Sequence, residues 1–261
     1  MIVSRIQGGL GNQMFQYAFG YNLSKKYDLK LFIDKSFYSN QGNVIRYFNL
    51  DYFEVEINDI SQNKFLINRP FTIISDLNYF VDHKLNSRES YYLDGYWQSE
   101  KFFKDYTDDL RKIFKMKTTD SENFCIENNL GNSETISIHV RRGDYVGSED
   151  YHPTQNLKYY ENAIDELGTY EKVLIFSDDM EWCKENFKFD RMIFCEGFKN
   201  VEDLMIMSQC KNNIISNSSF SWWAAYLNNN IEKKIIAPKL WYGSKMNIET
   251  KDLVPENWIR I

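Results

Sequence analysis

The segment Ser137–Val146 holds the residues whose types and spacing are best suited to chemistry. It reads Ser-Ile-His-Val-Arg-Arg-Gly-Asp-Tyr-Val, so an apolar run ends in two arginines, a glycine and an aspartate. Two adjacent guanidinium groups can offer planar sets of N–H donors to a phosphate or diphosphate. The glycine permits close approach of the backbone, and the aspartate adds a carboxylate beside the cations. By itself the pattern fits an anion site and a solvated surface loop about equally well.

Two other loops have the composition of phosphate-binding turns. Gly8–Asn12 lies between an apolar run and a helical pattern, although Met14 stands where a dinucleotide fingerprint has its third glycine. Ser216–Trp223 places small hydroxylated residues before an aromatic helix, where they can cap the helix or face a phosphate. Taken singly, a tight turn is the favoured reading of the first loop and a helix cap that of the second.

Acidic residues and histidines give weaker signals. Ser177–Asp179 ends a predicted strand, and its two carboxylates could cap the next helix, contact a ligand hydroxyl or bind a metal, with capping as the default. The chain has no Asp-x-Asp sequence, and its three histidines are too scattered for metal-ligand spacing. We therefore predict no metal site. His139 lies beside the arginines, where a structural hydrogen bond and a ligand contact both stay open.

The elements that must position these loops alternate between strand and helix. Ile2–Ile6 and Leu29–Ile33 read as strands on either side of a helix, which predicts a doubly wound α/β opening. The second half repeats the alternation, with predicted strands at 135–140, 172–176, 192–195, 213–216 and 234–237. Ligands bind open α/β sheets at the carboxyl ends of the strands, so the polar loops are expected to converge there.

The sequence predicts two Rossmann-like halves that face each other across a cleft. We expect an amino-terminal domain over 1–130, a carboxyl-terminal domain over 131–240, and a tail over 241–261 that packs back on them. The polar stretch 115–134 is the candidate interdomain region. The irregular, aromatic-rich stretch 35–86 is a candidate lid or acceptor-facing insertion.

Composition narrows the class of protein. A hydrophobic share of 43% supports buried cores, and a net charge of −6 argues against wholesale nucleic-acid binding and for a focused site for a small anion. Four cysteines without Cys-x-x-Cys spacing favour a reduced, intracellular compartment. We find no targeting pattern and no apolar run of the ~20 residues that cross a bilayer. The expectation is a cytoplasmic protein, with peripheral contact at the inner face of a membrane left open.

Four blocks of the sequence resemble those of a known family. His139–Tyr145 is similar to the His-x-Arg-Arg-Gly-Asp-Tyr signature of the α-1,2-fucosyltransferases, glycosyltransferase family 11. The resemblance extends to Gly8–Ala18, Asp94–Gln98 and Ser216–Leu227. It implies a GT-B fold and inverting, metal-independent transfer of fucose from the co-substrate GDP-β-L-fucose to the 2-hydroxyl of a terminal β-galactoside. No cofactor is implied.

The resemblance also implies roles for individual residues. Arg141 would be the main contact of the donor diphosphate, Arg142 would support the loop or the donor, and His139 would lie near the nucleoside. Asp203 matches an acidic position that reads guanine in related α-1,6-fucosyltransferases. The full donor-binding set that we predict is Gly9, Asn12, His139, Arg141, Arg142, Asp203, Ser218, Ser219 and Phe220.

The general base stays open between two carboxylates. Glu149 stands eight residues after Arg141, the offset of the catalytic glutamate in the α-1,6 relatives, but this loop varies in the α-1,2 family. Asp144 lies within the signature and could instead orient the arginines. Arg141, Asp144 and Glu149 are thus the catalytic candidates. The alternatives are another nucleotide-sugar transferase on the same fold and a noncatalytic glycan-binding protein.

Overall fold

The computed structural model describes residues 1–41, 45–116, 120–131 and 133–261, which divide into two compact units. The amino-terminal unit comprises Met1–Lys117 and Glu249–Pro255, and the carboxyl-terminal unit comprises Thr118–Ile248 and Glu256–Ile261. The last part of the chain is therefore shared between the units. Within the predicted interdomain stretch, the chain forms a helix of the carboxyl-terminal unit, α4 (Asp120–Glu127).

The amino-terminal unit is built on a four-stranded parallel sheet with the order β2-β1-β4-β3. The predicted opening of strand, glycine loop, helix and strand is confirmed by β1, α1 and β2. The main elements are β1 (Ile2–Arg5), α1 (Leu10–Tyr27), β2 (Leu31–Asp34), β3 (Thr72–Ser75), β4 (Tyr91–Asp94) and α3 (Thr107–Ile113). Strand β3 was not predicted, because three of its four residues are exposed and it has no apolar alternation.

The predicted insertion over residues 35–86 is mostly irregular chain, interrupted by short turns of helix and by β3. Residues 42–44 of that stretch lie outside the described residues. The short elements of the unit are η1 (Ser36–Ser39), η2 (Leu50–Tyr52), η3 (Ile60–Gln62), α2 (Lys64–Ile67), η4 (Glu100–Phe102) and η5 (Lys104–Tyr106). None of them is longer than four residues, which is why their sequence shows no helical or strand period.

Buried glutamines fix the glycine loop of this unit. Gly8 has a φ of +77°, a conformation that side-chain-bearing residues rarely adopt. The amide of Gln13 donates to the carbonyls of Gly8 and Tyr47, and the Oε1 of Gln16 accepts the backbone N–H of Gln7. Both glutamines are fully buried on α1. Much of the polar character of the Gly8–Ala18 block therefore serves to hold the loop.

The Asp94–Gln98 motif has a structural explanation as well. A Cβ on Gly95 would collide with the Cβ of Asp76, so only glycine lets the chain pass at this point. The Oδ2 of Asp76 accepts the backbone N–H groups of Tyr96 and Trp97 at 3.0 and 2.8 Å. Trp97 itself is buried in the aromatic core of the unit.

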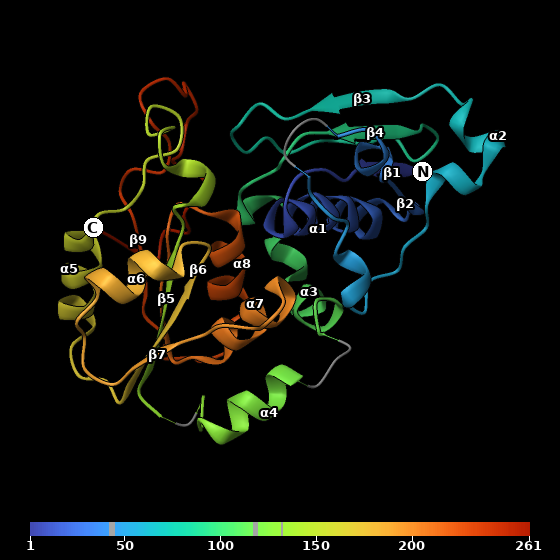
Figure 1. Cartoon of the computed structure of the whole chain (residues 1–261). Coiled ribbons are helices and arrows are strands. Elements are labelled where there is room, and N and C mark those ends of the chain that lie inside the picture. The colour runs from blue at the N-terminus through green and yellow to red at the C-terminus, as the bar shows by residue number, and fades with distance from the viewer. Residues whose placement is uncertain (42–44, 117–119, 132) are drawn as a thin grey trace. The chain divides into compact units, whose positions relative to one another are not determined.

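The carboxyl-terminal unit contains a six-stranded parallel sheet with the order β10-β9-β8-β5-β6-β7. Figure 1 shows α5 and α6 on one side of this sheet and α7 and α8 on the other. The elements are β5 (Thr135–Val140), η6 (Gly143–Tyr145), α5 (Leu157–Leu167), β6 (Lys172–Ser177), α6 (Met180–Asn186), β7 (Met192–Phe194), α7 (Asn200–Gln209), β8 (Asn212–Ile214), α8 (Ser219–Leu227), β9 (Ile235–Ala237) and β10 (Ile259–Arg260). Every strand that the sequence predicted here is present, within about two residues at each end, and a helix follows each of β5, β6, β7 and β8 as the predicted alternation requires.

Strand β5 lies in the middle of this sheet, and all six of its residues are buried. It pairs in parallel with β6 in a register that places His139 beside Phe176 and Val140 beside Ser177. The residues that follow the two strands therefore emerge side by side at the carboxyl edge. Within the described ranges, no helix is both long and apolar enough to cross a bilayer.

Candidate functional site

Arg141 leaves the end of β5 and is held by two carboxylates. Its Nη1 lies 2.7 Å from Oδ2 of Asp178, which follows β6, and its Nη2 lies 2.5 Å from Oδ1 of Asp144. The centre of the guanidinium is 5.4 Å from the ring centroid of Tyr145. The side chain is 22% exposed, so the group is fixed yet reachable from solvent. A guanidinium has five N–H donors, and these two ion pairs engage one on each terminal nitrogen.

Arg142 is bound more closely to the protein. Its Nε donates to Oδ2 of Asp179 at 3.0 Å, and its guanidinium lies 4.3 Å from the centroid of the Trp182 ring. Its backbone N–H donates to Oδ1 of Asp178 at 2.9 Å. A cation that both stacks on an aromatic ring and pairs with a carboxylate is strongly oriented. Of the two roles expected for Arg142, the geometry favours support of the loop.

The turn after the arginines is closed by contacts to the loop that precedes α8. Gly143 lies directly against Asp178, since a Cβ there would come within 2.6 Å of that carboxylate. The hydroxyl of Tyr145 donates to the backbone carbonyl of Asn217 at 3.1 Å, and the Tyr145 ring stacks on His152. The Arg-Gly-Asp-Tyr signature and the serine-rich segment thus form one structure.

His139 is a buried, neutral ring next to this cluster. Burial, together with the positive charge of Arg141, lowers the pKa of His139 to about 3. Its Nδ1 is hydrogen-bonded to the hydroxyl of Ser216 at 2.9 Å, and its ring centroid lies 5.3 Å from that of Phe220. Of the two readings left open by the sequence, a structural hydrogen bond is present.

The serine segment caps helix α8, as its default interpretation predicted. Ser218 is the N-cap residue, and its hydroxyl accepts the backbone N–H of Phe220 at 3.3 Å. Ser219 and Phe220 form the partly exposed first turn of the helix. Capping uses the Ser218 hydroxyl, while the positive end of the helix dipole still faces the carboxyl edge of the sheet.

Asp203 is a carboxylate with a buried, unpartnered oxygen. It lies in the first turn of α7, and its Oδ1 is buried without a hydrogen-bond partner in the part of the chain that the structure describes. Burial, together with the neighbouring Glu202, raises the pKa of Asp203 to about 7. Such a group commonly marks a place that a ligand donor completes.

The other predicted site residues belong to other segments of the chain. Glu149 sits in an exposed loop where its Oε1 accepts the N–H of Gly147 at 3.0 Å, and this bond lowers the pKa of Glu149. Gly9 and Asn12 belong to the amino-terminal unit. Gly9 is the N-cap of α1, and the Oδ1 of Asn12 accepts from the Gln98 amide at 2.8 Å. Arg141, Asp144 and His139 are grouped around the end of β5.

Sequence reasoning marked Ser177–Asp179 as a possible ligand contact, but it did not predict that Asp178 pairs with Arg141. Asp179 does what the default predicted, because its Oδ1 accepts the Trp182 N–H and caps α6. It also binds Arg142, however, and Asp178 binds Arg141. The signal that could have found this pairing is the equal spacing of two adjacent acids and two adjacent arginines after neighbouring strands.

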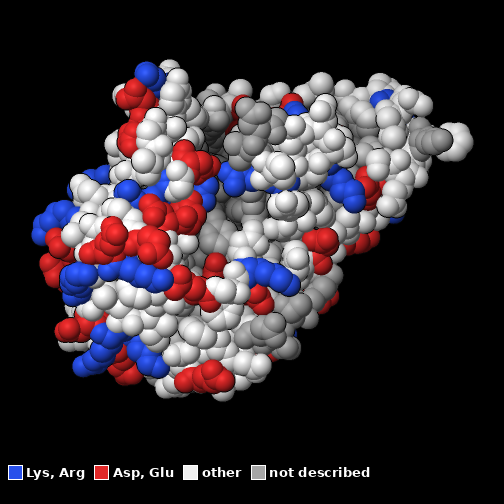
Figure 2. Space-filling view, in the orientation of Figure 1, with Lys and Arg blue, Asp and Glu red and all other residues white. Residues whose placement is uncertain are grey.

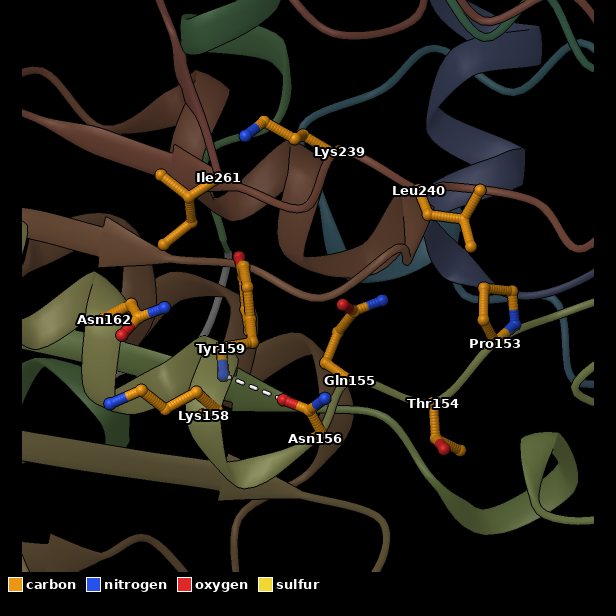
Figure 3. Close-up of a pocket in the computed structure, with 10 residues that line it drawn as sticks. All are labelled: Pro153, Thr154, Gln155, Asn156, Lys158, Tyr159, Asn162, Lys239, Leu240 and Ile261. Carbon is orange, nitrogen blue, oxygen red and sulfur yellow. Dashed lines mark hydrogen bonds between the residues drawn. The ribbon is translucent and has the colours of Figure 1, made fainter.

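The carboxyl-terminal unit also has a shallow hollow of about 400 Å³ that holds none of the predicted site residues. It lies at the start of α5, where Asn156 caps the helix by accepting the Tyr159 N–H, and it is open to solvent (Figure 3). Acidic and basic side chains are interspersed on the face of this unit drawn in Figure 2. Over the described residues, no group of three or more His, Cys, Asp or Glu side chains is arranged to hold a metal ion.

Comparison with known proteins identifies the family. The profile of the family described as glycosyl transferase family 11 matches residues 1–261. An α-1,2-colitosyltransferase of Escherichia coli is 33% identical over 100% of this chain and 99% of its own length. The O-antigen biosynthesis glycosyltransferase WbnK of Escherichia coli is 29% identical over 99% of both chains. A bovine galactoside α-(1,2)-fucosyltransferase 2 is 26% identical over 84% of this chain and 67% of its own length.

Solved structures agree on the fold. The fucosyltransferase NodZ from Bradyrhizobium superposes with a TM-score of 0.57 at 16% identity, covering 85% of this chain and 91% of NodZ. POFUT1 in complex with GDP-fucose also gives 0.57, at 11% identity, covering 90% of this chain and 97% of POFUT1. These likenesses confirm the predicted GT-B fold with its parallel α/β units. The chain belongs to glycosyl transferase family 11 and is a glycosyltransferase.

Proposed function

We propose that this enzyme transfers L-fucose from GDP-β-L-fucose to the 2-hydroxyl of a terminal β-galactoside, with inversion and without a metal ion. Relatives that are named as α-(1,2)-fucosyltransferases support this reaction, as do structural neighbours that were solved with GDP-fucose. The observation that carries the proposal is Arg141, a solvent-reachable guanidinium fixed at the carboxyl end of the central strand.

Arg141 would act on the charge of the leaving group. When the glycosidic bond of a GDP-sugar breaks, the sugar gains oxocarbenium character and negative charge grows on the diphosphate. A preoriented cation stabilises that charge without reorganisation during the step. The dipole of α8, whose first turn carries Ser219 and Phe220, would add to the effect in the same direction.

Asp203 would select the base of the nucleotide. Guanine presents two adjacent N–H donors, on N1 and on the exocyclic N2, and a carboxylate accepts both. The buried Oδ1 of Asp203, which has no partner among the described residues, is an acceptor available for one of these donors. In this proposal the neutral ring of His139 and the Phe220 ring lie near the nucleoside, and Gly9 and Asn12 contribute from the amino-terminal unit.

Transfer of colitose is the second candidate. The α-1,2-colitosyltransferase matches this chain over its full length at 33% identity. Colitose is the 3-deoxy analogue of fucose, so the same diphosphate and guanine contacts serve both donors. The two functions differ in whether the enzyme recognises the 3-hydroxyl of the sugar. A noncatalytic glycan-binding protein is disfavoured, because glycan binding alone does not require the arginine cluster.

A donor and acceptor panel tests the proposed function. We expect GDP-fucose with a terminal β-galactoside, such as lactose or N-acetyllactosamine, to give a product whose linkage analysis shows fucose on O2 of galactose. Activity should persist in EDTA. Preferred use of GDP-colitose would replace fucose by colitose in the proposal, and use of another linkage position or dependence on a divalent cation would refute the stated reaction.

Arg141→Ala should lower turnover with GDP-fucose by roughly 10²–10³-fold, since it removes a preoriented donor to the leaving group. Arg142→Ala should act less on turnover and more on stability, because Arg142 is bound to Asp179 and Trp182. Steady-state kinetics and thermal melts of both variants measure the difference. Near-normal turnover of Arg141→Ala would show that this arginine does not serve the leaving group.

Asp144 and Glu149 remain the candidates for the base that accepts the acceptor proton. Asp144 is paired with Arg141 in this structure, and Glu149 has a lowered pKa because it accepts the Gly147 N–H. If either is the base, its amide variant (Asp144→Asn or Glu149→Gln) should lose the acidic limb of the kcat/KM–pH profile, where the wild-type carboxylate takes up a proton. Unchanged profiles for both variants would exclude both residues.

Asp203→Asn should change stability and nucleotide binding in opposite directions. The raised pKa of Asp203 means that its contribution to stability is complete below about pH 4 and is lost as the pH rises to about 7. The variant should therefore melt above the wild type at pH 8 and converge with it near pH 4. It should bind GDP more weakly, without the gain in affinity that the wild type shows as the pH rises through 7. Equal GDP affinities at pH 8 would remove Asp203 from the guanine site.

A further inference from the structure

Two aspartates stand opposite two arginines at the carboxyl edge of the second sheet. Strands β5 and β6 pair with Val140 beside Ser177, and one residue further along each strand brings Arg141 beside Asp178. One residue beyond that, Arg142 meets Asp179. The register of the strands thus creates two neighbouring ion pairs. Asp178 pairs with Arg141, and Asp179 pairs with Arg142.

Asp178 uses both of its oxygens on the arginine loop. Its Oδ1 accepts the backbone N–H of Arg142 at 2.9 Å, and its Oδ2 lies 2.7 Å from Nη1 of Arg141. The carboxylate is anchored to the main chain of the same loop whose side chain it orients. Gly143 is needed for this contact, because any Cβ there would stand 2.6 Å from Oδ2.

Asp144 holds the other side of Arg141 in a different way. It is three residues along the chain in the short η6 turn, and its side chain is 44% exposed, against 27% for Asp178. An exposed ion pair is weak and readily exchanged for another anion. Asp178 is therefore the durable partner of the guanidinium, and Asp144 occupies the side that faces solvent.

We propose that Asp178 is a positioning residue that aims Arg141 at the diphosphate of the nucleotide. The carboxylate fixes Nη1, and because the guanidinium is planar this contact sets the directions of its other N–H donors. For this role, the gain from orienting Arg141 must exceed the repulsion between the negative charge of Asp178 and the bound anion. This role rests on the proposed function, because it requires a diphosphate-containing donor.

The direction of the change in diphosphate affinity distinguishes a positioning role of Asp178 from simple charge repulsion. Asp178→Asn keeps an amide oxygen that can accept the Arg142 N–H but removes the charge that binds Arg141. Asp179→Asn is the matched control, because it removes the same charge one residue away and leaves the Arg141 pair intact. If charge alone mattered, both variants would bind a diphosphate more tightly than the wild type.

The experiment is calorimetric titration of folded wild type and variants with GDP, inorganic pyrophosphate and guanosine. We expect Asp178→Asn to lose about 10-fold or more in affinity for GDP and pyrophosphate, the loss typical of one charge-assisted hydrogen bond, with guanosine binding unchanged. Asp179→Asn should lose much less. Wild-type affinity in Asp178→Asn, tighter binding, or equal losses in both variants would overturn the positioning role.

A second variant keeps the test decisive if Asp178→Asn does not fold. Gly143→Ala retains every charge, and its Cβ would stand 2.6 Å from Oδ2 of Asp178, so the carboxylate that pairs with Arg141 must shift. It should weaken GDP and pyrophosphate in the same proportion and leave guanosine unaffected, and wild-type affinities would contradict the inference. If the wild type itself binds neither GDP nor pyrophosphate, the proposed function fails and the role of Asp178 falls with it. If the wild type binds both and the variants match it, only the positioning role is lost.

Discussion

The candidate site depends on the parallel register between β5 and β6. Because the two strands end together, two arginines and two aspartates that are far apart in sequence emerge as neighbours. Had the register slipped by one residue, Arg141 would meet Asp179 or Ser177, and the Gly143 contact with Asp178 would be lost. The buried sheet fixes the register, since all six residues of β5 pack in the core.

Buried hydrogen bonds fix the positions of α7 and α8 on that sheet. The Asn213 amide on β8 donates to the Ser137 hydroxyl on β5 and to a carbonyl of α7. The Asn228 amide after α8 donates to Oδ1 of Asn213, which ties the end of that helix to the same strand. Unpaired polar groups in such a core are costly, so each alternative packing of these helices is penalised. Because these contacts hold the helices on the sheet, they also restrain the loops at its carboxyl edge.

Asp203 is the one carboxylate among several buried side chains of the described residues that have an atom without a hydrogen-bond partner. Its buried Oδ1 lacks a partner among the described residues, whereas His139 beside the arginines is neutral and bonded to Ser216. The strand-end carboxylates Asp178 and Asp179 are paired with arginines, whereas Asp203 lies in the first turn of α7 and its Oδ1 has no such partner among the described residues. The relatives include enzymes named for colitose and for fucose, and under the proposed function the two sugars are distinguished by contacts other than those to the nucleotide.

The sequence by itself determined the fold class, nearly all strands and helices of the carboxyl-terminal unit, and the family. Strong hydrophobic periods and short motifs such as His139–Tyr145 are local properties, and local properties can be read from the chain. Strand β3, the two-residue β10 and the helix α4 escaped, because short or exposed elements have no period of their own. Only the tertiary structure showed that Asp178 pairs with Arg141, that Arg142 is bound to Asp179 and Trp182, and that Asp203 has an oxygen without a partner among the described residues. The two ion pairs depend on which strand ends lie side by side, and the environment of Asp203 depends on how α7 packs; both arise from contacts between residues that are far apart in the sequence.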